Sequence, residues 1–303
     1  MSRLLVTGAT GKSGAWFMRQ LERDSGPFLS DGPVRVIVRP TSGTETLQKS
    51  PMSLDIRTGD LSDPKFLHNA MEDVDVVLHI AGIHWSRQVV QAALDAGCQW
   101  LILVHTTGIF SKYKQASADY LETERWIESA TRGSTMAVTI LRPTMIYGTL
   151  DDANISRFIR MVDSLPVIPV VSGGEYTLRP VHCQDLGVAY HQVLMTESTR
   201  GKTYVLSGGT EVTLRSMMVR IARNLRLVRP VVSVPFGLAY GLAWLAYIVS
   251  IKRIDFRERV QRLCEDRSYP HDEATTDFGY SPRDFLRGLK DECYLYAHGQ
   301  GKG

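Results

Sequence analysis

Residues 3–14 read RLLVTGATGKSG, a short apolar run that leads directly into a glycine-rich loop. The apolar run predicts a β-strand, and the residues after the loop have the pattern of a helix. In such a unit Gly8 permits a tight turn, Gly11 lets the backbone approach a pyrophosphate, and Gly14 lets the helix lie close to the sheet. The free N–H groups of the helix then face the phosphates. This context favours a dinucleotide-binding loop over a glycine-rich turn without a ligand.

Short apolar runs alternate with helical patterns through the first half of the chain, which is typical of βαβ units in a parallel sheet. We expect strands at 3–7, 34–38, 55–58, 74–80, 100–105 and 137–141, and helices at 15–22, 64–71, 86–96 and 113–130. The predicted fold is α/β, with a doubly wound parallel sheet of the Rossmann type. Residues 1–150 would form it, with returning segments from about 175–210, and residues 151–303 would form a smaller C-terminal, partly helical substrate-binding portion.

The composition is that of a packed globular protein, with 44% hydrophobic and 22% charged residues among 303. The 35 basic residues are balanced by 32 acidic ones, so no nucleic-acid partner is predicted. The four cysteines have no CxxC or CxxH spacing, and we therefore predict neither a metal site nor a disulfide framework. No signal-peptide pattern precedes the first strand. We expect a cytoplasmic protein with reduced thiols.

Residues 231–251 contain no charged side chain and are bracketed by basic residues on both sides. The segment is long enough to span a bilayer, although Pro235, Gly237 and Gly241 interrupt it. Three interpretations stay open: a buried or partner-covered helix, an interfacial contact with a membrane, and a true span. The sequence thus points to a peripheral membrane or protein contact here, and a homodimer through a helix pair is a further alternative.

Four later motifs accompany the loop: residues 59–61 (GDL), 79–82 (HIAG), 141–148 (LRPTMIYG) and 180–186 (PVHCQDL). With the Gly-x-x-Gly-x-x-Gly spacing, they make the chain resemble the extended and atypical short-chain dehydrogenase/reductase family, of the epimerase/dehydratase type. The resemblance implies an NAD(P)-dependent oxidoreductase or epimerase-like enzyme, whose small-molecule substrate would be a nucleotide sugar or a similar bulky polar compound. The cofactor contacts expected from the loop and the resemblance are Gly8, Thr10, Gly11, Lys12, Ser13, Gly14, Arg39, Asp60, Leu61, Ala81, Gly82, Pro143 and Met145.

Arg39 ends the second predicted strand, where a site that prefers NAD places an acidic residue on the ribose 2′-hydroxyl. A cation at this position suits the 2′-phosphate of NADP, and Lys12 could assist it. The alternative is a solvated strand-end charge. We predict that the cofactor is NADP(H) rather than NAD(H).

The catalytic residues of the family are only partly present. Family enzymes pair a Ser or Thr with Tyr-x-x-x-Lys, and Thr106 or Thr107 can supply the hydroxyl. Tyr120 is followed four residues later by Glu124. In the other register Tyr120 takes the lysine position and Ala116 the tyrosine position, so neither register restores the pair. A carboxylate near a phenol also disfavours its ionisation.

Other residues could take part in the reaction. The candidate catalytic residues are Thr106, Thr107 and Tyr120, with His105, Lys112, Tyr113 and Lys114 as substitutes for the missing proton donor. Tyr147, Arg179 and His182 are the candidate substrate residues, and Arg157, Arg160 and Arg179 are basic residues available to an anionic substrate. Two hypotheses remain: an NADP(H)-dependent enzyme, and an NADP(H)-binding sensor or assembly protein without turnover.

Overall fold

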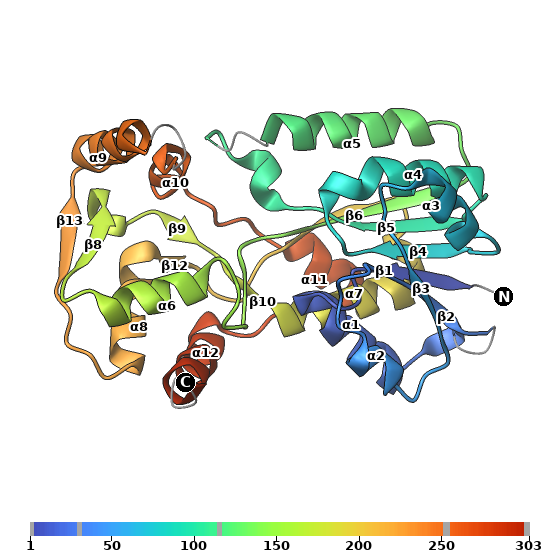
Figure 1. Ribbon diagram of the computed structural model, residues 1–303, viewed down its shortest axis with the longest axis horizontal. Coiled ribbons are helices and arrows are strands. Elements are labelled where there is room, and N and C mark those ends of the chain that lie inside the picture. The colour runs from blue at the N-terminus through green and yellow to red at the C-terminus, as the bar shows by residue number, and fades with distance from the viewer. Residues whose placement is uncertain (1–2, 29–31, 114–116, 251–254, 300–303) are drawn as a thin grey trace.

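A computed structural model describes residues 3–28, 32–113, 117–250 and 255–299. Its centre is a seven-stranded sheet with the order β11-β6-β5-β4-β1-β2-β3, in which all neighbouring strands are parallel (Figure 1). The strands of this sheet are β1 (Leu4–Thr7), β2 (Val34–Val38), β3 (Leu54–Thr58), β4 (Val76–His79), β5 (Trp100–Val104), β6 (Ala137–Pro143) and β11 (Thr203–Leu206). The prediction of a doubly wound parallel sheet is confirmed.

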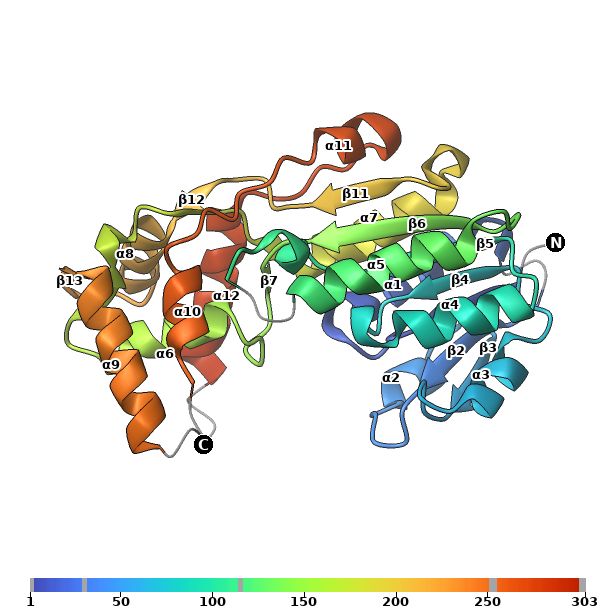
Figure 2. The ribbon, with the colours of Figure 1, turned by 90° about the horizontal axis from the view of Figure 1, so that it is seen from above.

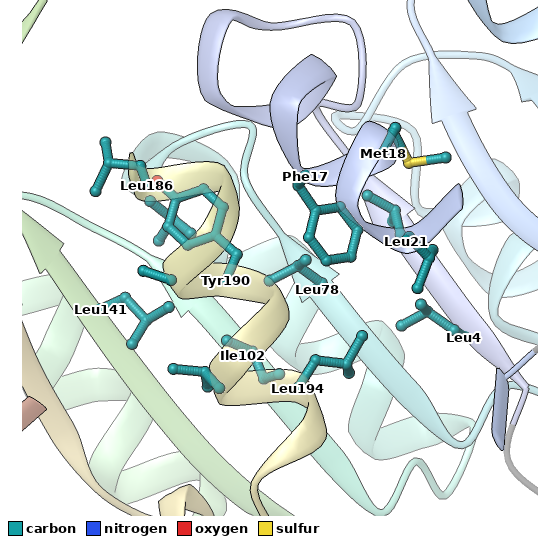
Figure 3. Close-up of a cluster of buried hydrophobic side chains, with 14 of the residues drawn as sticks. Leu4, Phe17, Met18, Leu21, Leu78, Ile102, Leu141, Leu186, Tyr190 and Leu194 are labelled. Atoms are coloured by element: carbon teal, nitrogen blue, oxygen red, sulfur yellow. The ribbon is translucent and has the colours of Figure 1, made fainter. Parts of the chain in front are cut away.

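Helices cover both faces of the sheet because its strands are apolar on both sides. Leu4 and Val6 of β1 face one core, with α1 (Lys12–Arg23) and α7 (Cys183–Met195). Figure 3 shows side chains of these two helices packed together over the strands. Leu5 faces the other core. The helices over that face are α3 (Pro64–Met71), α4 (Ser86–Asp95) and α5 (Ser117–Thr131).

The strand order reverses at β1, which lies between β2 and β4. Ligands of doubly wound sheets bind at such a reversal, beyond the carboxyl ends of the strands. The predicted strands all occur within a few residues of their expected bounds, while α1 begins earlier than predicted, inside the glycine loop. Part of the predicted helix at 113–130 lies outside the described residues, and α5 begins at Ser117.

A second group of elements lies beyond the carboxyl ends of the strands (Figure 2). Three two-stranded sheets belong to it: β7 (Ile146–Tyr147) with β10 (Val181–His182), β8 (Ile168–Val171) with β13 (Val231–Val234), and β9 (Thr177–Leu178) with β12 (Val212–Thr213). Its helices are α6 (Ile155–Ser164), α8 (Leu214–Asn224), α9 (Phe236–Val249), α10 (Arg257–Arg262) and α12 (Phe285–Gly299). A separate apolar core joins α6, α8 and α12. We call this group the C-terminal part.

Two contacts tie the C-terminal residues back to the rest of the molecule. The helix α11 (Asp272–Phe278) lies beside the sheet edge, where Asp277 accepts a hydrogen bond of 2.6 Å from the Tyr204 hydroxyl. In α12, Glu292 is buried and accepts a bond of 3.1 Å from the Gly148 N–H. Burial and the nearby Asp152 raise the pKa of Glu292 to about 9. The segment after β7 is thus anchored where the sheet meets the C-terminal part.

A short helix, α2 (Glu45–Gln48), lies between β2 and β3 in the chain.

The charge-free segment forms β13 and α9, and α9 is not buried within the chain. Ala243 is its single buried residue. In the described part of the chain, no helix combines the length and the apolar character needed to cross a bilayer.

Candidate functional site

The glycine loop forms a cradle in which a side chain would collide with the backbone. Gly8 has a φ of +76°, and the Gly11 N–H donates to its carbonyl at 2.9 Å. A Cβ on Gly14 would lie 2.1 Å from the Gly8 carbonyl oxygen, and one on Gly8 would lie 2.8 Å from the Ala81 nitrogen. Gly11 is the N-cap of α1 and offers no side chain to the first N–H groups, and the first turn has no acidic residue. The loop therefore suits an anion at the helix N-terminus.

The loop opens onto a hollow of about 640 Å³ at the reversal point of the sheet. Nine of the predicted cofactor residues line it: Gly8, Thr10, Gly11, Lys12, Ser13, Arg39, Asp60, Leu61 and Ala81. Gly59, Ile80 and Ile146 also line it and belong to the motifs 59–61, 79–82 and 141–148, although they were not named as contacts. Lining residues outside any predicted motif are Ile37, Val38, Ser42, Trp85 and Asn154. Ile37 and Val38 lie at the carboxyl end of β2, so the strand assignment could have found them. Asn154 comes from beyond the sheet and carried no signal. The donors, glycines and space fit a dinucleotide.

The other four predicted cofactor residues, Gly14, Gly82, Pro143 and Met145, do not line this hollow. Gly14 acts through its close approach to Gly8. Gly82 has a φ of +101°, and its carbonyl is 3.0 Å from His79 Nε2. The Pro143 carbonyl accepts a bond of 3.2 Å from the Thr107 hydroxyl, and Met145 lines a neighbouring hollow.

The two predicted cations, Arg39 and Lys12, have different neighbours. Arg39 lines the hollow at the end of β2, is exposed, and helps, after the stronger hydrogen bonds from Ser62, to lower the pKa of Asp60. Lys12 Nζ is 3.5 Å from an oxygen of Asp151, in the loop after β7. Both residues line the hollow, and Lys12 has an acidic partner.

A second hollow of about 320 Å³ adjoins the first, because Ile146 and Asn154 line both. Thr106 and Thr107 line it from the end of β5, as predicted for the hydroxyl that orients a substrate. The Thr106 hydroxyl accepts a hydrogen bond of 3.0 Å from the Gly108 N–H. The remaining lining residues are Gly108, Ser111, Thr144, Met145, Leu178, Arg179, Arg262, Arg267 and Tyr269.

Three arginines, Arg179, Arg262 and Arg267, converge on this second hollow. The Nε atom of each is buried and has no hydrogen-bond partner in the described structure. Burial, with a contribution from the neighbouring Arg262, lowers the pKa of Arg267 to about 10, so that side chain is still charged at neutral pH. Arg262 Nη1 also lies 3.9 Å from Glu258, and Arg179 Nη1 donates to the Tyr269 carbonyl at 3.5 Å. The buried Nε–H groups that have no partner still favour an anionic ligand.

Only one of the three arginines suggested by the sequence for an anionic substrate is in place. Arg179 lines the hollow, whereas Arg157 is exposed outside it and Arg160 donates to the Leu150 carbonyl at 3.0 Å. Arg262 and Arg267 were missed because they follow the charge-free segment and have no local motif.

Tyr120 lines neither hollow. It packs between Ile83 and Ile109, with its ring centroid 5.7 Å from that of His84. Burial is the main cause of the increase in the pKa of its hydroxyl. The expected roles of Thr106 and Thr107 suit the structure better than that of Tyr120.

Glu124, at the expected lysine position, belongs to a buried network. Its oxygens accept bonds from His105 Nδ1 at 2.9 Å and from Arg142 Nε at 3.2 Å, and it also pairs with the Arg142 Nη2. Burial opposes ionisation, but these bonds lower the pKa of Glu124. The carboxylate therefore ties α5 to the ends of β5 and β6.

The substitute proton donors do not converge on the site. His105 is buried between Glu124 and the Ser86 hydroxyl, 3.1 Å from its Nε2, and Tyr113 is 42% exposed. The backbone N–H of Lys112 donates to Glu265 at 2.7 Å. Lys114 and Ala116 lie outside the described residues.

Tyr147 and His182, predicted as substrate residues, lie within the core and line neither hollow. Their rings are 5.1 Å apart, and a Cβ on Gly288 would meet the Tyr147 hydroxyl at 2.2 Å. Burial lowers the pKa of His182 to about 4. Direct substrate contact by either ring is at odds with this burial, whereas Arg179 is at the surface of the hollow.

The family model of NAD(P)H-binding proteins matches residues 8–165, which include the glycine loop and both threonines. The chain belongs to the NAD(P)H-binding family. Membership in this family indicates that the chain binds NAD(P)(H). It does not distinguish NADP from NAD.

Two relatives and one solved structure illustrate the range of similar proteins. The ceramide reductase of Caulobacter vibrioides is 25% identical over 55% of this chain and 53% of its own, so the chain spans about half of that relative. The mitochondrial NADH-ubiquinone oxidoreductase 40 kDa subunit of Neurospora crassa is 22% identical over 95% of this chain and 80% of its own length. The structure of the dTDP-glucose 4,6-dehydratase of Streptomyces venezuelae is 20% identical in sequence. It superposes with a TM-score of 0.74 over 99% of this chain and 98% of the dehydratase chain. The resemblance to epimerases and dehydratases is confirmed for the fold.

Proposed function

We propose that the chain is an NADP(H)-dependent oxidoreductase or epimerase-like enzyme whose bulky polar substrate carries an anionic group. One observation carries the proposal: the hollow at the glycine loop adjoins a second hollow lined by three arginines, with Ile146 and Asn154 shared between them. Nucleotide sugars are one class with the required charge. The four cysteines are free, which supports, without testing it, the expectation of a cytoplasmic protein.

In this proposal, some residues of the second hollow bind the substrate and others orient it. A bound nicotinamide supplies or accepts a hydride. The Thr106 hydroxyl borders the second hollow and can orient the reacting oxygen, while the arginines hold the anionic end of the substrate. Glu124 is engaged with His105 and Arg142, and Tyr120 is a buried residue that lines neither hollow. Proton exchange would therefore use water or a substrate group instead of a Tyr-Lys pair.

Replacing Arg39 with alanine should weaken NADPH binding about 10- to 100-fold, because a hydrogen bond to a charged group contributes roughly 1.5–3 kcal/mol. NADH has no 2′-phosphate, so its affinity should change less than about threefold, the scale of a surface substitution. Fluorescence titration of wild-type and variant protein with both cofactors measures the ratio. An equal loss for NADPH and NADH would contradict the assignment of Arg39 to the 2′-phosphate.

The substrate part is tested by NADPH oxidation over a panel of carbonyl compounds that differ in an anionic group. Turnover should require that group, and Arg262→Gln should raise KM about tenfold or more with a smaller effect on kcat, because it removes a binding charge. Arg157→Gln is the matched control, since Arg157 is exposed outside the hollow. Equal turnover of charged and neutral substrates, or equal KM in both variants, would refute the anionic site.

A second candidate function is a cofactor-binding assembly protein without turnover. The engagement of Glu124 in a buried network and the absence of a Tyr-Lys pair in either register favour it. The similarity to the oxidoreductase subunit of Neurospora crassa is consistent with this alternative. Retained NADPH binding with no oxidation across the whole panel would select it over the enzyme.

A further inference from the structure

One wall of the second hollow is a short segment that connects the C-terminal part with the region of the sheet. Residues 262–269, which we call the strap, begin at the last residue of α10 and lead toward α11 beside the sheet (Figure 1). Arg262, Arg267 and Tyr269 line the hollow from the strap, whereas Thr106 lines it from the segment after β5. Two of the arginines proposed to bind the anion therefore stand on a different segment from the hydroxyl proposed to orient the reacting oxygen.

Glu265 of the strap is bonded to the segment after β5. One of its carboxylate oxygens accepts a hydrogen bond of 2.7 Å from the Ser111 hydroxyl, and the other accepts one of 2.7 Å from the Lys112 backbone N–H. The Phe110 and Tyr269 rings add a contact between the same two segments, with their centroids 5.2 Å apart. Hydrogen bonds to a carboxylate are stronger than those between neutral groups. Glu265 therefore fastens the strap to the segment after β5.

The next two residues of the strap are bonded to the C-terminal part instead. Asp266 Oδ1 accepts bonds from the Thr177 N–H at 2.8 Å and from the Thr177 hydroxyl at 2.9 Å. The Arg267 backbone N–H donates to the Thr177 carbonyl at 2.8 Å. Because Thr177 belongs to β9, the strap is held from two sides, by β9 and by the segment after β5. These bonds together fix where the strap arginines lie relative to Thr106.

Ser111 belongs to the same compact turn as the threonines of the hollow. It directly follows the short helix η3 (Thr107–Phe110), and its N–H donates to the Gly108 carbonyl at 3.2 Å. The Gly108 N–H in turn donates to the Thr106 hydroxyl at 3.0 Å. A displacement of the strap at Ser111 would therefore reach Thr106 through a single intervening residue.

We propose that Glu265 is a positioning residue that sets the distance between the Thr106 hydroxyl and the strap arginines, and so selects substrates by the spacing between their reacting carbonyl and their anionic group. This inference rests on the proposed function. A substrate held at both ends reacts well only if its spacing matches that distance, since a misplacement of about 1 Å can cost about 100-fold in rate. Glu265 is not among the described residues that line the hollow, so it acts through Ser111 and the strap.

The test uses a series of ketones whose terminal phosphate is separated from the carbonyl by an increasing number of methylene groups. NADPH oxidation by the wild type should favour one spacing over its neighbours by about tenfold or more in kcat/KM. Glu265→Ala should lower kcat at that spacing about 10- to 100-fold, with a smaller effect on KM because the arginines remain. The preference between neighbouring spacings should fall toward equality.

Two further variants separate positioning from a general loss of contacts. Glu265→Gln should keep most of the preference, because its amide oxygen can accept from Lys112 and its amide N–H can donate to the Ser111 oxygen. Glu211→Ala is the matched control: Glu211 also accepts a hydrogen bond from a strap hydroxyl, that of Ser268, but it precedes β12 in the C-terminal part. This control should keep the wild-type kcat and spacing preference.

Thermal unfolding and NADPH titration check that each variant keeps its fold and its cofactor site. A spacing preference that is lost in Glu265→Ala and kept in Glu265→Gln and Glu211→Ala supports the proposal. It is overturned if Glu265→Ala lowers turnover equally at every spacing, or if the wild type has no spacing preference. A wild type that binds NADPH but turns over no carbonyl compound would refute the proposed function, and the positioning role with it.

Discussion

Substituting Gly14 by alanine is expected to raise the Kd for NADPH about 10- to 100-fold. The added Cβ would lie 2.1 Å from the Gly8 carbonyl oxygen and 2.9 Å from its carbon, so the loop and the first turn of α1 must move apart. Overpacking of this kind costs roughly 1–3 kcal/mol, and each 1.4 kcal/mol is a tenfold change in affinity. The displaced loop is the one whose N–H groups would face the phosphates.

Fluorescence titration with NADPH, together with urea unfolding, measures this effect. Gly241→Ala is the matched control, because Gly241 also lies in a helix but an added Cβ there meets nothing within 4 Å. The control should bind NADPH like the wild type and be as stable or slightly more stable, given the better helix propensity of alanine. Unchanged NADPH affinity in Gly14→Ala would contradict the assignment of this loop to the cofactor.

Replacing Glu124 with alanine should lower the free energy of unfolding by about 3–5 kcal/mol, the usual effect of removing one partner of a buried ion pair. The Glu124 and Arg142 side chains are only 11% and 18% exposed, and His105 would lose its bond as well. Urea denaturation followed by circular dichroism gives the difference.

The control on the same helix is Glu128→Ala. Its partner Arg132 is 3.9 Å away, and both side chains are more than three-quarters exposed, so the loss should be below about 1 kcal/mol. Glu124→Lys restores the family residue in one register, but it should destabilise further and give no gain in turnover, because the lysine would face Arg142. A stable, more active Glu124→Lys would overturn the structural role of Glu124.

The sheet and the cofactor loop could be predicted because their signals are local. Glycine spacing after a strand, and apolar runs of strand length, depend on a few neighbouring residues, and Gly8, Gly11 and Gly14 lie where the motif requires. Arg39 was found for the same reason, since it directly follows β2. Domain boundaries, dimerisation and the cellular compartment stay predictions.

The second hollow could be predicted only in part: Thr106, Thr107 and Arg179 were named from the sequence, but its other arginines come from distant segments. Arg262 and Arg267 meet Arg179 only after the chain has crossed α7, α8 and α9. In the sequence, Glu124 stands where the family has a lysine, and its structural role could not be predicted. Its partners His105 and Arg142 lie in other parts of the chain. The composition of residues 231–251 could be read from the sequence, but the exposure of α9 could not. That exposure depends on which other elements pack against the helix.

The most direct test of the account is a parallel titration of the purified wild-type protein with NADPH and NADH, followed by cofactor fluorescence. We expect saturable binding of both, with NADPH about 10- to 100-fold tighter because of the charge at Arg39. Tighter binding of NADH would contradict the role of Arg39. Failure to bind either cofactor would contradict the central claim that the glycine-loop hollow holds NADP(H).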